Sequence, residues 1–174
     1  MGGEIIKIRE AKPDDAVELA RVYEETWRST YQGIIPHLHL ERMIARRGAR
    51  WWHQSVQRGN IVSVMTFNGH PQGYASYGQA RHTPNRATGE IYELYVAPCF
   101  QGLGLGKKLF VHARRSLERR GLRTMVIWAL AENEAACDFY QRQGGKRVAT
   151  VPEHYGRIEL QKVAFAWSAT AKSR

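Results

Sequence analysis

Alternating and periodic apolar positions divide the first part of the chain into a strand and a long helix. Residues 5–9 alternate as a half-buried strand does, and Pro13-Asp14-Asp15 then favours the start of a helix. Apolar side chains recur from there to about Ser29 at helical spacing, at Ala16, Ala20, Tyr23 and Trp27. The chain therefore opens with a strand followed by an amphipathic helix.

The next segment breaks into shorter elements. Between residues 38 and 56 the apolar pattern predicts one broken helix or two short helices, with Gly48 as the break. Residues 60–67 and 73–77 are typical of strands, and Asn68-Gly69 between them is a strong hairpin signal. We expect these two strands to pair antiparallel, and a loop to follow over residues 79–89.

The second half of the chain repeats the order strand, helix, strand. A β-branched and aromatic run over residues 91–96 predicts a strand, and three glycines at alternate positions lead from it into a helix. Residues 124–130 are typical of a buried strand, and residues 134–143 of a second helix. Residues 148–151 and 158–167 predict two closing strands. The repeated order indicates an α/β protein whose sheet is at least partly parallel.

The composition is that of one globular domain. The chain has 174 residues, of which 43% are hydrophobic and 24% charged, so a single domain over residues 1–174 is expected. No apolar run approaches the roughly 20 residues of a membrane span, and the N-terminus has no signal-peptide core. We therefore expect a cytoplasmic protein. Cys99 and Cys137 lack metal-ligand spacing and are expected to be reduced thiols, and no metal site is predicted.

The glycines at positions 102, 104 and 106 indicate the chemistry of the ligand. Glycine lets the backbone approach a ligand closely, and the free N–H groups of the first helical turn point toward an anion. A Walker loop is disfavoured because Gly106-Lys107-Lys108 has no hydroxyl for magnesium. The dinucleotide fingerprint is disfavoured because Lys107 or Leu109 stands where its third glycine belongs. The loop therefore predicts another phosphorylated ligand.

The string Leu94-Tyr95-Val96-x-Pro98 followed by Gln101-x-x-Gly104-x-Gly106 closely resembles the acetyl-CoA pyrophosphate loop of the GNAT superfamily of N-acetyltransferases. The resemblance spans roughly residues 5–167. It implies a mixed central sheet flanked by helices in the order βααβββαβαββ, acetyl-CoA as cosubstrate, and a homodimer. The residues that it assigns to cofactor binding are Leu94, Tyr95, Val96, Gln101, Gly102, Leu103, Gly104, Leu105, Gly106, Lys107, Asn133 and Tyr140.

The same resemblance suggests catalytic and acceptor residues. Amine acetylation needs a base for the amine and an acid for the departing thiolate. Glu90 matches the spacing of the catalytic glutamate in histone-type members, Glu93 is the second candidate base, and Tyr140 is the candidate acid. Either glutamate can instead simply pair with a surface arginine. Three residues from the end of the first predicted helix and the turn after it are candidates for acceptor contact, or for core packing: Trp27, Tyr31 and Ile35.

The net charge of +10 keeps a second class of function open. Several arginines follow the glycine loop, on and after the predicted helix: Arg114, Arg115, Arg119, Arg120 and Arg123. A solvated helix face is the usual explanation of such a run. Nucleic-acid binding is disfavoured because no nucleic-acid motif accompanies the charge. The sequence thus predicts direct acetyl transfer to a primary amine of a small molecule or protein, with a silent CoA sensor or a basic nucleic-acid-binding module as alternatives.

Overall fold

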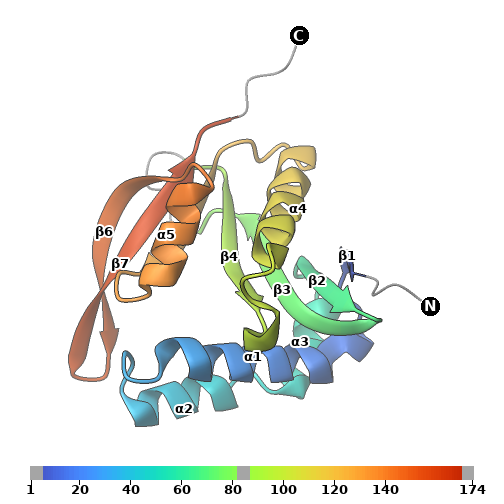
Figure 1. The fold of residues 1–174 in the computed structure, drawn as a ribbon, viewed down its shortest axis with the longest axis horizontal. Coiled ribbons are helices and arrows are strands. Elements are labelled where there is room, and N and C mark those ends of the chain that lie inside the picture. Colours follow the sequence, from blue (N-terminus) through green and yellow to red (C-terminus); the bar gives the residue numbers. More distant parts are fainter. Residues whose placement is uncertain (1–5, 82–86, 170–174) are drawn as a thin grey trace. The chain divides into compact units, whose positions relative to one another are not determined.

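The computed structural model describes residues 6–81 and 87–169. Their elements, shown in Figure 1, are β1 (Ile6–Glu10), α1 (Ala16–Tyr31), α2 (His37–Ala45), α3 (Ala49–Gln57), β2 (Val62–Phe67), β3 (His70–Gln79), β4 (Gly89–Val96), α4 (Leu105–Arg119), β5 (Met125–Leu130), α5 (Glu134–Arg142), β6 (Lys146–Tyr155) and β7 (Ile158–Trp167). Short 3-10 turns at Pro13–Asp15 and Pro98–Phe100 precede α1 and follow β4.

Seven strands form one mixed sheet in the order β1-β2-β3-β4-β5-β7-β6. The β4–β5 pair is parallel, whereas β1–β2, β2–β3, β5–β7 and β6–β7 are antiparallel. The parallel pair follows from the strand-helix-strand order, because α4 carries the chain back to the edge from which β4 started. The predicted α/β class and mixed sheet are confirmed.

The chain divides into two compact units, which are described separately. The first unit holds Met1–Ser76 and Glu93–Ala113, and the second holds Tyr77–Tyr92 and Arg114–Arg174. Strands β3 and β4 and helix α4 therefore each run from one unit into the other. None of the helices in the described part of the chain combines the length and apolarity that a membrane crossing requires.

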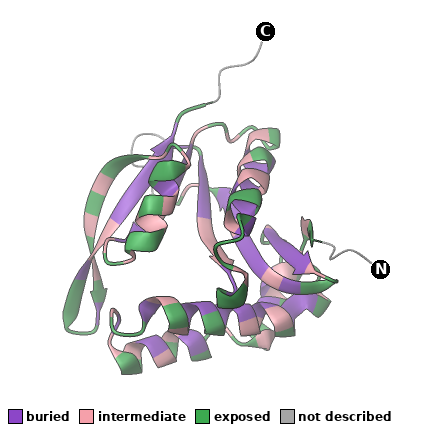
Figure 2. Ribbon diagram, in the orientation of Figure 1, coloured by how far each residue is buried: buried purple, intermediate pink, exposed green. Residues whose placement is uncertain are grey.

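In the first unit α1 buries one continuous face, visible in Figure 2 as purple segments between green ones. Leu19, Val22, Tyr23 and Trp27 lie on this face and are at most 8% exposed. Their spacing of three or four residues is the helical pattern that the sequence predicts. Thr26 adds a polar group to the same face, and its hydroxyl donates to the Val22 carbonyl at 2.6 Å, so that it is buried without losing a hydrogen bond.

Two short helices occupy the segment between α1 and β2, which confirms one of the two predicted alternatives and adds a helix to the predicted order. Gly48 stands at the break, with extended backbone immediately before α3. The β2–β3 hairpin turns at Asn68 (φ 49°) and Gly69 (φ 88°). Positive φ at both central residues is what a type I′ turn demands, and Asn-Gly meets it at low cost.

In the second unit α5 packs on the sheet through Tyr140, whose ring lies 5.8 Å from that of Phe165 and 6.3 Å from that of Trp167. Strand β6 is much longer than the predicted residues 148–151, because it pairs with β7 over its whole length up to Tyr155. The apolar pattern of the sequence does not reveal the full length of β6, because one face of the strand is exposed and Pro152 lies within it. Both features are typical of an edge strand. The predicted loop 79–89 falls partly outside the described residues.

Candidate active site

The connection from β4 to α4 lies in the first unit, and hydrogen bonds fix it to β3 and to the end of β4. The Ala97 amide donates to the Gln72 carbonyl at 2.8 Å, which fixes the end of β4 to its neighbour. The Gln101 side chain donates from Nε2 to the Val96 carbonyl at 2.8 Å. Gln101 therefore ties the start of the glycine loop back to the end of the strand.

Beyond Gln101 the loop turns through two left-handed glycines, Gly102 (φ +76°) and Gly104 (φ +73°), and a Cβ at either would meet no protein atom within 4 Å. Helix α4 begins at Leu105, which is buried, and the Lys108 amide donates to the Gly104 carbonyl at 3.3 Å. The amides of residues 102–107 donate to no group in the described part of the chain. A row of unpaired N–H groups at a helix start is suited to an anion such as a diphosphate.

Glu93 forms a buried ion pair in the first unit. Its carboxylate accepts from the Arg47 guanidinium, and more weakly from Tyr74 Oη at 3.4 Å and Ser76 Oγ at 3.3 Å. Arg47 also lies over the rings of Trp51, at 4.5 Å, and Tyr23, at 5.3 Å. Burial, with the charge of Glu93, raises the pKa of Tyr74 well above its ordinary value. The phenol therefore stays protonated and donates to the carboxylate.

Two of the predicted acceptor residues, Trp27 and Tyr31, belong to an aromatic cluster in the same unit. The Trp27 ring lies 4.8 Å from Tyr31 and 6.3 Å from Tyr95, and the Tyr31 and Tyr95 hydroxyls are 3.1 Å apart. Burial raises the pKa of Tyr95 well above its ordinary value. All three predicted residues are buried, with Ile35 3% exposed. Trp27 Nε1 and Trp52 Nε1 are buried and have no hydrogen-bond partner among the described residues, so the cluster contains two unused donors.

Glu90 is held differently, in the second unit. It is 2% exposed, and its two oxygens accept from the Arg81 amide and from Arg81 Nη2, both at 2.8 Å. The Arg81 guanidinium lies 4.0 Å over the Tyr92 ring, and Tyr92 Oη donates to the Gln79 carbonyl at 2.6 Å. Glu90 thereby anchors the chain that leaves β3.

The second unit also carries the predicted Asn133 and Tyr140. Asn133 caps α5, because its Oδ1 accepts from the Ala136 amide at 3.2 Å. Tyr140 is 6% exposed near the end of the same helix. Gly145 lies against it: a Cβ there would stand 2.9 Å from the Tyr140 carbonyl and 2.5 Å from Trp167 Cζ2. Only glycine permits this close approach behind Tyr140.

Cys137 lies in an environment that disfavours the thiolate. Cys137 Sγ lies 3.6 Å from the Leu130 carbonyl, and burial raises the pKa of its thiol. A raised thiol pKa leaves little thiolate at neutral pH, which disfavours an acyl-enzyme at this residue. Cys99 is exposed. No three potential metal-ligating side chains gather within residues 6–81 and 87–169.

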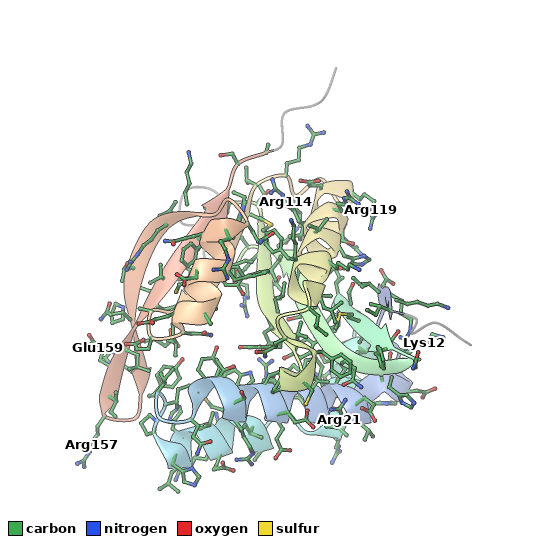
Figure 3. All side chains as sticks on the ribbon, viewed as in Figure 1. Lys12, Arg21, Arg114, Arg119, Arg157 and Glu159 are labelled. Atoms are coloured by element: carbon green, nitrogen blue, oxygen red, sulfur yellow. The ribbon has the colours of Figure 1, made fainter. Side chains whose placement is uncertain are left out.

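Sequence reasoning missed Arg47 and Arg81, the partners of the two glutamates. Arg81 follows β3, the neighbour of β4 in the strand order. Arg47 and Glu93 are 46 positions apart and carry no shared motif, so only the folded chain brings them together. Figure 3 labels Arg114 and Arg119 on α4. Arg114 pairs with Glu118 at 3.3 Å, and Arg119 donates to Ser116 Oγ at 2.9 Å.

The sequence and the fold of this chain are similar to those of known acetyltransferases. The chain is 28% identical over 163 residues to the uncharacterized N-acetyltransferase YuaI of Bacillus subtilis, covering 94% of this chain and 93% of that protein. It is 30% identical over 138 residues to the mycothiol acetyltransferase of Cellulomonas flavigena, but covers only 38% of that protein. The same fold occurs in the PaiA N-acetyltransferase of Thermoplasma acidophilum, solved with coenzyme A (TM-score 0.74, 19% identity, 94% of this chain and 99% of that chain).

A further structure with this fold is YncA of Salmonella typhimurium, solved with acetyl-CoA (TM-score 0.69, 24% identity, 98% of this chain and 97% of that chain). The profile of the Acetyltransferase (GNAT) family matches residues 19–145, from α1 to the glycines after α5. The glycine loop, the mixed sheet and this match together show that the chain belongs to the GNAT family of N-acetyltransferases.

Proposed function

We propose that residues 1–174 act as one domain that transfers an acetyl group from acetyl-CoA directly to a primary amine. The observation that carries the proposal is the row of unpaired amides over residues 102–107 at the start of α4. The open space beside Gly102 and Gly104 fits the close approach of a diphosphate. Two structural neighbours, PaiA solved with coenzyme A and YncA solved with acetyl-CoA, support the choice of ligand.

The cofactor-binding residues follow from this placement. Residues 102–107 would hold the diphosphate through main-chain N–H groups, with the Lys107 side chain at the same helix start. The backbone of Leu94, Tyr95 and Val96 would bind the pantetheine arm as an added strand. Gln101 acts indirectly, because its Nε2 already donates to the Val96 carbonyl. Acetyl-CoA supplies an activated thioester, whose carbonyl the Val96 N–H would polarise.

The acceptor amine must lose a proton. An amine with a pKa of about 10.4 is neutral in only about four molecules per ten thousand at pH 7, so a base is needed before or during attack. Glu90 matches the family spacing, whereas the Glu93 carboxylate has one oxygen that receives only long hydrogen bonds, at 3.4 and 3.3 Å. We propose that one of these two carboxylates accepts the proton, directly or through water.

Tyr140 is proposed as the acid that protonates the departing thiolate, and Asn133 as a contact of the pantetheine arm. The rings of Phe165 and Trp167 and the tight Gly145 hold Tyr140 in one orientation. A side chain fixed in this way loses little entropy on reaching its working position. Trp27, Tyr31 and Ile35 would shape the acceptor side.

Two measurements test the proposal. Titration calorimetry with acetyl-CoA should detect binding, and CoA release in the presence of an amine panel should detect transfer. Glu90→Gln and Glu93→Gln, assayed at saturating acceptor, should identify the base by a loss of kcat. Protein that folds but binds no acetyl-CoA would end the transferase proposal, and protein that binds it without any CoA release would indicate a silent sensor.

A further inference from the structure

The charges on the helices of the first unit are unevenly paired. The acidic residues of α1 and α2 all bind arginines: Glu18 and Glu25 pair with Arg21, and Glu24 and Glu41 with Arg28. Figure 3 shows Arg21 on α1. No acidic residue remains on these helices to bind a cationic ligand.

Most arginines of the α2–α3 segment, in contrast, have no acidic partner among the described residues. Arg42, Arg46 and Arg50 are exposed, and their guanidinium groups bind no other residue in the described part of the chain. Arg47 pairs with Glu93 of β4, so this glutamate is neutralised as well. The surplus of positive charge at the end of α2 and the start of α3 favours an anionic group nearby.

One edge of the Arg47 guanidinium is available to bind an anionic group. Its Nη1 donates to Glu93, whereas Nε and Nη2, which share the other edge of the guanidinium, donate to no described residue. This edge presents two parallel N–H groups, the geometry that binds a carboxylate in bidentate fashion. The Trp51 and Tyr23 rings hold the guanidinium plane, and its side chain remains 31% exposed. The Nε–Nη2 edge of Arg47 therefore has a fixed orientation and is accessible to a ligand.

Two buried donors without a partner among the described residues, Trp27 Nε1 and Trp52 Nε1, belong to the same cluster. Tyr23, which lies under Arg47, also packs against Trp27 at 4.9 Å between ring centroids. Trp27 Nε1 is buried and has no partner among the described residues. A buried N–H without an acceptor is unfavourable, and a ligand oxygen would satisfy it. All of these groups are donors, so each suits an acceptor atom of a ligand.

We propose that the acceptor is a primary amine that carries a carboxylate, as an amino acid does, and that Arg47 is the residue that selects it. The inference rests on the proposed acetyl transfer. One guanidinium separates Glu93 from the free Arg47 edge, so an amine that faces Glu93 has its carboxylate only a few bonds away. A polyamine finds no unpaired carboxylate on α1, α2 or α3 and meets the surplus arginines instead.

The test is an acceptor panel with acetyl-CoA and the full-length protein, read out as CoA release. The panel contains the common α-amino acids, γ-aminobutyrate, butylamine and putrescine, with phosphoethanolamine as the phosphate arm. We expect the best carboxylate-bearing amine to exceed butylamine and putrescine in kcat/KM by roughly 10- to 100-fold, the worth of a charge-assisted bidentate contact.

Three variants assign the effect to Arg47. Arg47→Met should remove the preference mainly through KM. Arg47→Lys keeps a positive charge beside Glu93 but has no two-donor edge, so it should fold and lose most of the preference. Arg58→Met, which removes an exposed charge after α3, should leave the preference unchanged.

Several outcomes would overturn the inference. These are equal or better turnover of butylamine or putrescine, an undiminished preference in Arg47→Lys, preference for phosphoethanolamine over every carboxylate, and no turnover of any panel member by protein that binds acetyl-CoA. Failure to bind acetyl-CoA at all is a separate result, since it removes the proposed function itself.

Discussion

Replacing Gly104 by alanine separates the two uses of glycine in the loop before α4. Gly104 has a φ of +73° and open space where a Cβ would stand, so alanine introduces backbone strain without a clash inside the protein. If glycine serves only the turn, stability alone should change. If the loop holds a diphosphate, the methyl group also obstructs the ligand, and acetyl-CoA affinity should fall further than stability does.

The size of the stability effect follows from the backbone. A non-glycine residue in the left-handed region costs about 1–2 kcal/mol. Restricting the unfolded chain returns about 0.4–1 kcal/mol, so that roughly 1 kcal/mol of destabilisation remains. For a chain of this length such a change lowers Tm by about 2–4 °C. The protein therefore stays folded at 25 °C, and any loss of binding measured there reflects the loop.

Gly59 offers a matched control. It has a φ of +81° and, like Gly104, nothing within 4 Å of the added Cβ, but it lies between α3 and β2. We expect Gly59→Ala and Gly104→Ala to lower the free energy of unfolding about equally in urea titrations. Calorimetry should then show acetyl-CoA affinity unchanged in Gly59→Ala and reduced more than tenfold in Gly104→Ala, which is about 1.4 kcal/mol. Equal affinity in both variants would refute the loop as the diphosphate site.

Three other predictions test the chemistry and the ion pairs. Tyr140→Phe should lower kcat tenfold or more with acetyl-CoA affinity nearly unchanged, measured by CoA release and calorimetry, and full activity would exclude its role as acid. Cys137→Ala should retain activity, because burial raises the pKa of its thiol; a dead but folded variant would point to an acyl-enzyme. Burial raises the pKa of Asp15, but hydrogen bonds from Arg9 and the Lys12 amide outweigh it and hold that pKa below its ordinary value. The pair thus stabilises the fold above about pH 4 and loses this effect as pH falls further, so Asp15→Asn should flatten the acid limb of the unfolding free energy.

Much of the fold was predictable because local signals agreed with the tertiary structure. The β2–β3 hairpin has its two positive φ angles at Asn68 and Gly69, the residues that carry the turn signal. The buried face of α1 recurs at the predicted spacing. Strand β6 is the exception: it is long and mostly exposed, so no apolar alternation marks its ends, and pairing with β7 alone sets its length.

The site was predictable only where its chemistry is local in sequence. Strand, glycine turn and helix follow one another directly, so the free amides of residues 102–107 could be expected from the sequence. The partners of side chains could not, because Arg47 reaches Glu93 from a distant turn. The same limit applies to Trp27, whose unpaired Nε1 depends on how the surrounding rings pack.

The surroundings of the two β4 glutamates lead to different expectations for their glutamine variants. A carboxylate that takes up a proton needs an oxygen that is not already well hydrogen-bonded. Glu90 accepts two bonds of 2.8 Å, one on each oxygen, and is 2% exposed, whereas one Glu93 oxygen accepts only the longer bonds from Tyr74 and Ser76. We therefore expect Glu93→Gln to lower kcat at least tenfold in protein that still folds, although losing the charge opposite Arg47 also lowers its stability. Glu90→Gln should lower stability by about 1–3 kcal/mol, the usual effect of weakening a buried hydrogen-bonded carboxylate, and affect kcat less. A larger loss of kcat in Glu90→Gln than in Glu93→Gln would return the base to Glu90, the residue that the family spacing favours.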